Sequence, residues 1–151
     1  MINFRLLPKD FAYLGTEYNV VHINSENYKE NIPYIEKTIQ NFNAEIEWKD
    51  MFDLETAIFR FKTGMDMFIG VIDDEPFAHV WFDEYDLIST SKFLSNLFVK
   101  NKTENKAYTG KEFVSYIIHN YYSGVVIFCE VDDWNIRSIK LFEYLGFKKI
   151  K

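Results

Sequence analysis

The chain has 151 residues, of which 48% are apolar and 19% aromatic. This is enough for one domain with a packed core, and it argues against disorder. The formal net charge of −6 argues against general nucleic-acid binding, which usually shows a basic surface. Cys129 is the single cysteine, so an intramolecular disulfide and a cysteine-based zinc site are both excluded.

Targeting and metal signals are weak along the whole sequence. Three scattered histidines, His22, His79 and His119, match no metal-ligand spacing. No apolar run reaches membrane-spanning length, and residues 1–10 lack a signal-peptide core, so we expect a soluble, cytoplasmic protein. The abundance of Lys, Asn, Ile, Phe and Tyr is typical of an AT-rich bacterial or phage genome. Because no linker or repeat divides the chain, we predict one domain over residues 1–151.

The first quarter predicts a strand and a turn. Ile2, Phe4 and Leu6 alternate with polar residues, which indicates a half-buried strand. Pro8 ends it, and Asp10 could cap a helical turn over residues 11–14. Residues 18–23 fit either a short strand or an extended segment.

Two helices and a hairpin follow. Asn31 could cap a helix with Pro33 in its first turn, and its apolar residues recur at helical spacing. A second helix begins at Asp53 and ends at Gly64. Residues 67–72 and 76–82 then predict two strands joined by the acidic turn 73–76. The apolar residues of the two helices are Ile32, Ile35, Ile39, Phe42, Leu54, Ile58 and Phe61.

The last third predicts a strand–helix–strand–helix unit. An apolar run ends at Val99, a polar loop covers residues 100–110, and a helix covers about 111–122. The apolar run 125–131 and a helix from about Asn135 to Leu145 complete it, with a stop at Gly146. Two apolar runs joined through a helix predict parallel strands that are buried on both faces.

The loop before the first of these helices has the features of a phosphate site. A helix start offers unpaired N–H groups and a favourable dipole, and Gly110 permits close approach of the backbone. Four lysines gather there in an acidic chain: Lys100, Lys102, Lys106 and Lys111. The alternative is a solvated loop whose lysines serve solubility.

The segment from Asn135 through Ser138, Leu141 and Phe142 to Leu145-Gly146-Phe147 resembles the closing signature of the GNAT superfamily of acyl-CoA-dependent N-acyltransferases. The loop from Asn105 to Gly110 falls where that family holds the pyrophosphate of coenzyme A. The resemblance covers roughly the whole chain in element order. It implies an α/β (α+β) fold: a central mixed, mostly antiparallel sheet with a splayed parallel strand pair and helices on both faces.

The resemblance also implies roles for individual residues, with acetyl-CoA as cofactor. Pantetheine would lie between the splayed strands, beside Phe98 and Val99, and Asn135 would bind it. Phosphates would lie on the loop. Phe142 would line the cofactor site at the position where many members carry a Tyr that acts as general acid toward the leaving thiolate. As general base the sequence offers His79 and Glu84, each with a structural role as the alternative. The loop residues are Asn105, Lys106, Tyr108, Gly110 and Lys111.

Two functions remain open at this level. One is an N-acyltransferase acting on an amine of a small molecule or protein. The other is a catalytically inactive GNAT-like interaction or phage virion-assembly protein, favoured by three departures: Asn105 and Tyr108 in the loop, Phe142, and an expected missing last strand after Phe147. An open edge at residues 147–151 would predict a homodimer or a partner chain. Acidic residues near strand ends predict a negative rim for a cationic acceptor, or simply solubilising charge: Asp83, Glu84, Asp86, Glu130, Asp132 and Asp133.

Overall fold

The computed structural model describes residues 1–46, 51–85, 90–100 and 109–151. The strands are β1 (Ile2–Leu6), β2 (Asn19–Ile23), β3 (Asp66–Ile72), β4 (Glu75–Glu84), β5 (Lys92–Val99), β6 (Ile127–Val131) and β7 (Lys148–Ile150). The helices are α1 (Ile32–Glu45), α2 (Leu54–Lys62), α3 (Gly110–Tyr121) and α4 (Ile136–Tyr144), with 3-10 turns at Pro8–Asp10 and Tyr28–Asn31. Across the described residues the strands form one sheet in the order β2-β3-β4-β5-β6-β1-β7. Neighbours run antiparallel except β5 and β6, which are parallel.

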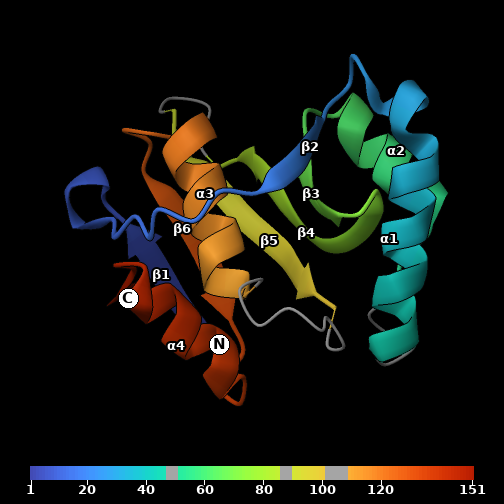
Figure 1. Ribbon diagram of the computed structural model, residues 1–151. Helices are drawn as coiled ribbons and strands as arrows, with labels where there is room; N and C mark the ends of the chain where they lie inside the picture. Colours follow the sequence, from blue (N-terminus) through green and yellow to red (C-terminus); the bar gives the residue numbers. More distant parts are fainter. Residues whose placement is uncertain (47–50, 86–89, 101–108) are drawn as a thin grey trace.

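The sheet carries helices on both faces (Figure 1). On one face Ile35 of α1 and Phe61 of α2 pack into a cluster with Ile69 and Trp81. On the other face α3 and α4 contribute to a second, larger cluster that includes Phe4. Burial of these apolar stripes is the main source of stability for such a layered arrangement. The mixed sheet, the splayed pair and the two helical layers confirm the fold class expected from the sequence.

Local signals fix the helix starts and the hairpin. The Asp53 side chain accepts a hydrogen bond from the Thr56 N–H at 2.8 Å, which caps α2 as predicted. Asp73 and Asp74 join β3 to β4 with φ values of 50° and 65°. Asp tolerates this left-handed region, and a two-residue turn of this kind matches the twist of a hairpin.

The expected helical turn over residues 11–14 is wrong. The 3-10 turn lies earlier, at Pro8–Asp10, where the fixed φ of proline favours the first turn position. The backbone after it bonds to other elements instead of to itself. The Ala12 N–H donates to the Leu145 carbonyl at 3.0 Å, and the Leu14 N–H donates to Ser115 Oγ at 2.9 Å.

The expectation of a missing last strand also needs correction. Residues after Phe147 form β7, which pairs antiparallel with β1. The first strand of the chain therefore lies inside the sheet, between β6 and β7. Strand β7 remains the end of the sheet order, and its two lysines, Lys148 and Lys149, are exposed. Edge lysines are a common protection against unwanted strand pairing.

Strand β6 is buried on one face only, not on both as predicted. Ile127, Cys129 and Val131 are buried, whereas Glu130 is exposed and Phe128 is partly exposed. The buried residues belong to the cluster under α3 and α4. Helices α1 and α2 lie over the β2–β4 side of the sheet (Figure 1), so none of the described helices covers the other face of β6. An alternating pattern is the expected result of one-sided covering.

Candidate functional site

A groove opens where the two parallel strands separate. Strands β5 and β6 pair only at Lys92 with Ile127 and Phe93 with Phe128. From Leu94 to Val99, β5 has no paired residue on the β6 side within the described part of the chain. Backbone groups along a separated strand need other partners. The splayed pair expected from the sequence is therefore present, and it leaves an edge that an extended ligand could pair with.

A local irregularity coincides with the separation. Asn96 has a φ of 50°, in the left-handed region that Asn enters more readily than most residues. The register between β4 and β5 shifts between His79 and Trp81, opposite this point. A bulge of this kind bends a strand and increases its twist. The bend lies within the part of β5 that has separated from β6.

The start of α3 lies beside the groove. Thr109 caps the helix: its Oγ accepts from the Glu112 N–H at 3.5 Å, and Glu112 accepts from the Thr109 N–H at 3.4 Å. This reciprocal pair is a capping box. The Phe113 N–H donates to the Thr109 carbonyl, so the N–H groups of Gly110 and Lys111 are the ones left to an anion at the helix start.

Gly110 is needed here for space. It is the first residue of α3 and lies between two cavities. A Cβ built on it would lie 2.8 Å from Cδ1 of Leu141 and 3.5 Å from Cγ2 of Val99. The first distance is shorter than real carbon contacts, so a side chain would have to displace Leu141 from the groove wall.

Positive charge gathers next to this helix start. Lys111 of α3 and Arg137 and Lys140 of α4 line one cavity together with Tyr144. Lys111 Nζ lies 4.3 Å from the centroid of the Tyr144 ring, a cation–π arrangement. Three cations from two helices thus face the same cavity as the N-terminus of α3.

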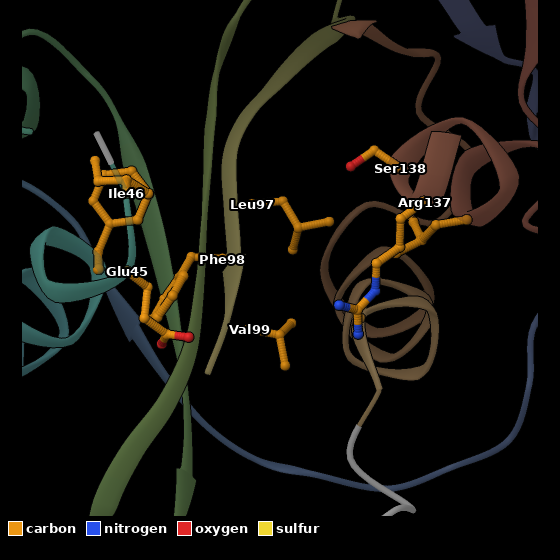
Figure 2. Close-up of a pocket in the computed structure, with 10 residues that line it drawn as sticks. Glu45, Ile46, Leu97, Phe98, Val99, Arg137 and Ser138 are labelled. Carbon is orange, nitrogen blue, oxygen red and sulfur yellow. The ribbon is translucent and has the colours of Figure 1, made fainter. Parts of the chain in front are cut away.

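The groove has two adjacent parts that share lining residues. The part next to α3 has a volume of about 250 Å³ and the part between β5 and β6 has one of about 360 Å³. Four residues line both parts: Phe42, Ile46, Leu97 and Ser138. Figure 2 shows Leu97 and Val99 on the side of β5 that faces α4, with the Arg137 guanidinium and the Ser138 hydroxyl opposite them. Phe98 points the other way, toward Glu45 and Ile46.

Two residues predicted from the closing signature have structural contacts. The Asn135 side chain accepts from the Ser138 N–H at 3.2 Å and so caps α4. Phe142 is 3% exposed, and its ring packs 6.4 Å from Phe4 and 5.1 Å from Phe147, centroid to centroid. Both nevertheless line the part of the groove between β5 and β6.

His79 lies behind the groove wall and not in it. Its Nδ1 lies 2.8 Å from Thr38 Oγ1, and Phe42 and Phe98 each lie 5.3 Å from its ring. Burial lowers the pKa of His79 to about 3, because a buried ring disfavours charge. The imidazole is therefore neutral at ordinary pH. Its Nε2 has no hydrogen-bond partner among the described residues.

Glu84 lies far along the sheet from the open end of the groove. It pairs with Lys92 at the start of β5, whereas Val99 at the open end pairs with Ala78. The structure therefore does not bring Glu84 together with His79 or with the start of α3.

The acidic rim divides into paired and unpaired residues. Asp83 forms an ion pair with Arg60, and Asp133 lies 3.0 Å from the amino group of Met1. Glu130 and Asp132 both line the groove between β5 and β6, and neither has an ion-pair partner among the described residues. Asp86 lies outside the described residues, as do Asn105, Lys106, Tyr108 and Lys102 of the predicted phosphate loop.

Sequence reasoning missed several groove residues. Arg137 and Lys140 are three positions apart on one helix, a spacing that places them on one side of it. This spacing could have been recognised in the sequence. The contribution of α1 had no such signal, because Phe42 reads as a core residue of an amphipathic helix. These missed residues are Phe42, Glu45, Ile46, Leu97, Arg137 and Lys140, whereas Ser138 and Leu141 were noted as part of the closing signature but not as groove residues.

Other kinds of site find no support in the described part of the chain. Cys129 is buried, as expected, and burial raises the pKa of its thiol. No group of His, Cys, Asp and Glu residues is placed to hold a metal ion within the ranges given above. Among the described helices, none has the length and apolar character needed to cross a membrane.

Comparison with known proteins identifies the fold. No protein-family model and no curated protein matches the chain. Solved structures do, including a GNAT-family acetyltransferase from Novosphingobium aromaticivorans (TM-score 0.64, 14% identity, 99% of this chain and 59% of that one). A second is an aminoglycoside acetyltransferase from a soil metagenome, in complex with trehalose (TM-score 0.60, 13% identity, 84% of this chain and 86% of that one). A third is ribosomal-protein-alanine N-acetyltransferase from Brucella melitensis (TM-score 0.57, 15% identity, 88% of this chain and 86% of that one).

These identities show the fold alone. The chain has the fold of the GNAT acetyltransferases, so the resemblance seen in the sequence is confirmed at that level. It spans 59% of the length of the Novosphingobium protein.

Proposed function

We propose that the chain is an acyl-CoA-dependent N-acyltransferase that moves an acetyl group to an amine of a small molecule or protein. The observation that carries the proposal is the junction of the splayed strands with a positively charged helix start. The open edge of β5 suits an extended arm with amide groups. The start of α3, with Lys111, Arg137 and Lys140 around it, suits the phosphates at the other end of such a molecule.

The residues present fit coenzyme A. The Gly110 and Lys111 N–H groups at the start of α3 are not used by the capping box, so they can donate to a phosphate oxygen. The cavity at this point is lined by cations and by an exposed aromatic ring, that of Tyr144, which suits a phosphorylated nucleotide. The groove beyond it is mainly apolar on the Phe42 and Leu97 side.

Each part of the chain would contribute a separate effect. When bound, the thioester supplies the activated acyl group. Strand β5 would hold the arm by backbone hydrogen bonds, and the α3 start with the nearby cations would fix its phosphate end. Phe42 and Ile46 of the α1 end would wall the groove and exclude water from the reacting centre. Proximity and orientation of this kind account for a large part of the rate in bimolecular transfer.

The acceptor would approach the part of the groove between β5 and β6. Glu130 and Asp132 lie there without an ion-pair partner among the described residues, and carboxylates attract ammonium groups. We therefore propose a cationic amine as acceptor. His79 and Glu84 stay predictions as general bases, and the neutral, buried ring of His79 would need the wall of Phe42 and Phe98 to move before it met a substrate.

The alternative function is a GNAT-like protein that lacks catalysis. It is favoured by Phe142, whose ring lines the groove at the position of the family's acid but carries no acidic proton. Titration calorimetry with coenzyme A and acetyl-CoA, followed by an assay of thiol release with a panel of amines, separates the two. Binding with turnover supports the enzyme. Binding without turnover for any amine supports the alternative, and absence of binding contradicts the proposed cofactor.

A further inference from the structure

The leaving sulfur of a thioester needs a group that stabilises its charge. Phe142 has no proton to share, and its ring packs against Phe4 and Phe147. Tyr144 faces the cavity that holds Lys111 and Lys140, at the opposite end of the groove from Glu130. If the proposed function is correct, another polar group must act at the reacting centre.

Ser138 occupies the point where the two parts of the groove meet. It lines both the part next to α3 and the part between β5 and β6. An arm that starts at the charged helix start and runs along β5 passes this point. Figure 2 shows the Ser138 hydroxyl directed from α4 toward β5, across from Leu97. Ser138 lies four residues before Phe142 on α4, so both lie on the same side of the helix.

The hydroxyl of Ser138 is available and its backbone is fixed. The Ser138 N–H donates to Asn135 Oδ1 at 3.2 Å, which locks the first turn of α4. No described residue forms a hydrogen bond with Ser138 Oγ, and the residue is partly exposed. A hydroxyl can rotate to suit a partner, as donor or as acceptor.

The other protic groups near this point are less suitable. Cys129 is 2% exposed, and its buried thiol belongs to the core cluster under α3 and α4. Asn135 already uses its side-chain oxygen as a helix cap. Ser95 lines only the part of the groove between β5 and β6, so it does not face the junction.

We infer that Ser138 is a catalytic residue whose hydroxyl donates a hydrogen bond to the leaving sulfur, a role that Phe142 cannot fill. The acceptor nitrogen forms a bond to the carbonyl carbon, the carbon–sulfur bond breaks with its electron pair on sulfur, and the nitrogen gives one proton to water. The sulfur leaves as a thiolate that Ser138 stabilises, and solvent protonates it after release.

This role predicts a measurable change in a bound thiol. A hydrogen bond to a charged group corresponds to about tenfold to 150-fold in an equilibrium or a rate. Ser138 should therefore lower the pKa of the thiol of bound coenzyme A. In Ser138→Ala this pKa should rise by about one to two pH units, and kcat should fall by about the same factor.

The experiment is a spectroscopic titration of the coenzyme A thiolate, by its ultraviolet absorbance, in complex with wild type and variants. Ser138→Thr keeps the hydroxyl and should restore the wild-type titration. Ser123→Ala removes an exposed hydroxyl from the turn after α3, outside the groove, and should leave the titration unchanged. If the thiol titrates alike in wild type and Ser138→Ala, the inference is overturned, and turnover with an amine would still support the proposed function.

A second variant tests the same idea through gain of function. Phe142→Tyr restores the family's acid, and Phe142 borders the same part of the groove as Ser138. Added to Ser138→Ala, it should recover part of the lost kcat and lower the thiol pKa again. A melting curve checks that each variant is folded. If wild type shows no heat with coenzyme A at all, the proposed function fails first, and the role of Ser138 falls with it.

Discussion

Replacing Gly110 tests whether the start of α3 holds a phosphate. The sequence alone suggests that a bulky residue would strain the backbone there, but the structure gives a different reason. Gly110 has no left-handed φ; instead its missing Cβ leaves room for Leu141, whose Cδ1 would lie 2.8 Å from that atom. In Gly110→Val the side chain would enter the groove itself, so a ligand could no longer approach the Gly110 and Lys111 amides.

The magnitude follows from the hydrogen bonds lost. Each bond from an amide to a charged phosphate contributes about 1.5–3 kcal/mol, so loss of one bond weakens binding by roughly tenfold to 150-fold. The difference in helix propensity between Gly and Val has little effect on stability at Gly110, because this is the first residue of α3, directly after the Thr109 cap. The expected cost to folding is that of crowding one leucine, about 1–3 kcal/mol at most, so Gly110→Val should melt cooperatively but bind coenzyme A weakly or not at all.

Titration calorimetry on four proteins separates the causes: wild type, Gly110→Val, Leu141→Ala and the double variant. If Gly110→Val acts by pushing Leu141 and shifting the helix start, the added Leu141→Ala should restore much of the binding. If the valine itself covers the amides, it should not. Binding by Gly110→Val within twofold of wild type, with the fold intact, would refute the reasoning that phosphate lies on this helix start.

The remaining predictions concern charge, pH and assembly. Arg137→Ala and Lys140→Ala should each weaken coenzyme A binding and reduce its salt dependence, whereas Lys148→Ala on β7 should change neither; equal effects of all three would point to net charge alone. Polyamine, aminoglycoside and lysine-peptide acceptors should be preferred at low salt, and the double variant Glu130→Gln, Asp132→Asn should lose this preference. Asp133→Asn should keep it, because Asp133 is already paired with the Met1 amino group. Equal use of anionic amines would contradict the prediction. Burial lowers the pKa of His79 to about 3, so as pH falls the unfolded chain protonates this histidine before the folded chain does. The free energy of unfolding should therefore decrease by roughly 1 kcal/mol per pH unit below about pH 6. Chemical denaturation of His79→Leu should show a weaker dependence of this free energy on pH, and an unchanged dependence would exclude His79 as its source. A homodimer or partner chain at the outer edge of β7 stays a prediction, although the exposed Lys148 and Lys149 oppose strand pairing there. A mass measurement in solution over a range of concentrations that finds only monomer, with no partner recovered, would contradict it.

The elements were predictable wherever a local signal decided them. The alternation of Ile2, Phe4 and Leu6 identified β1, and the Asn135 cap and Gly146 stop identified α4, because caps and periodicity act over a few residues. The turn over residues 11–14 failed because its backbone bonds to Leu145 and Ser115, partners more than a hundred residues away. No local pattern contains that information.

The place of β1 was also beyond local reasoning. It lies between β6 and β7, and it is this pairing that gives β7 a partner after Phe147. The same limit applies to the one-sided burial of β6. Its run of apolar residues suits a strand covered on both faces, but covering depends on how far α1 and α2 extend across the sheet.

The position of the groove was predicted, but most of the side chains that line it were not, because they too depend on how distant elements pack. The splayed strands and Gly110 followed from the family resemblance, which concerns the backbone. The side chains that line the groove, such as Phe42 of α1 and Arg137 of α4, come from elements whose patterns already serve the core or the surface. Assigning such residues a second role requires knowing which elements lie opposite each other.

Helix α4 shows how closely core and site are connected. Its nine residues place Ile139 and Phe142 in the core, Ser138 and Leu141 on the groove, and Arg137 and Lys140 by the helix start of α3. One rotation of this helix about its axis would move all three sets together. The Asn135 cap and the Phe142 contacts with Phe4 and Phe147 therefore do more than stabilise the fold, because they fix where the Ser138 hydroxyl and the Arg137 guanidinium lie relative to β5.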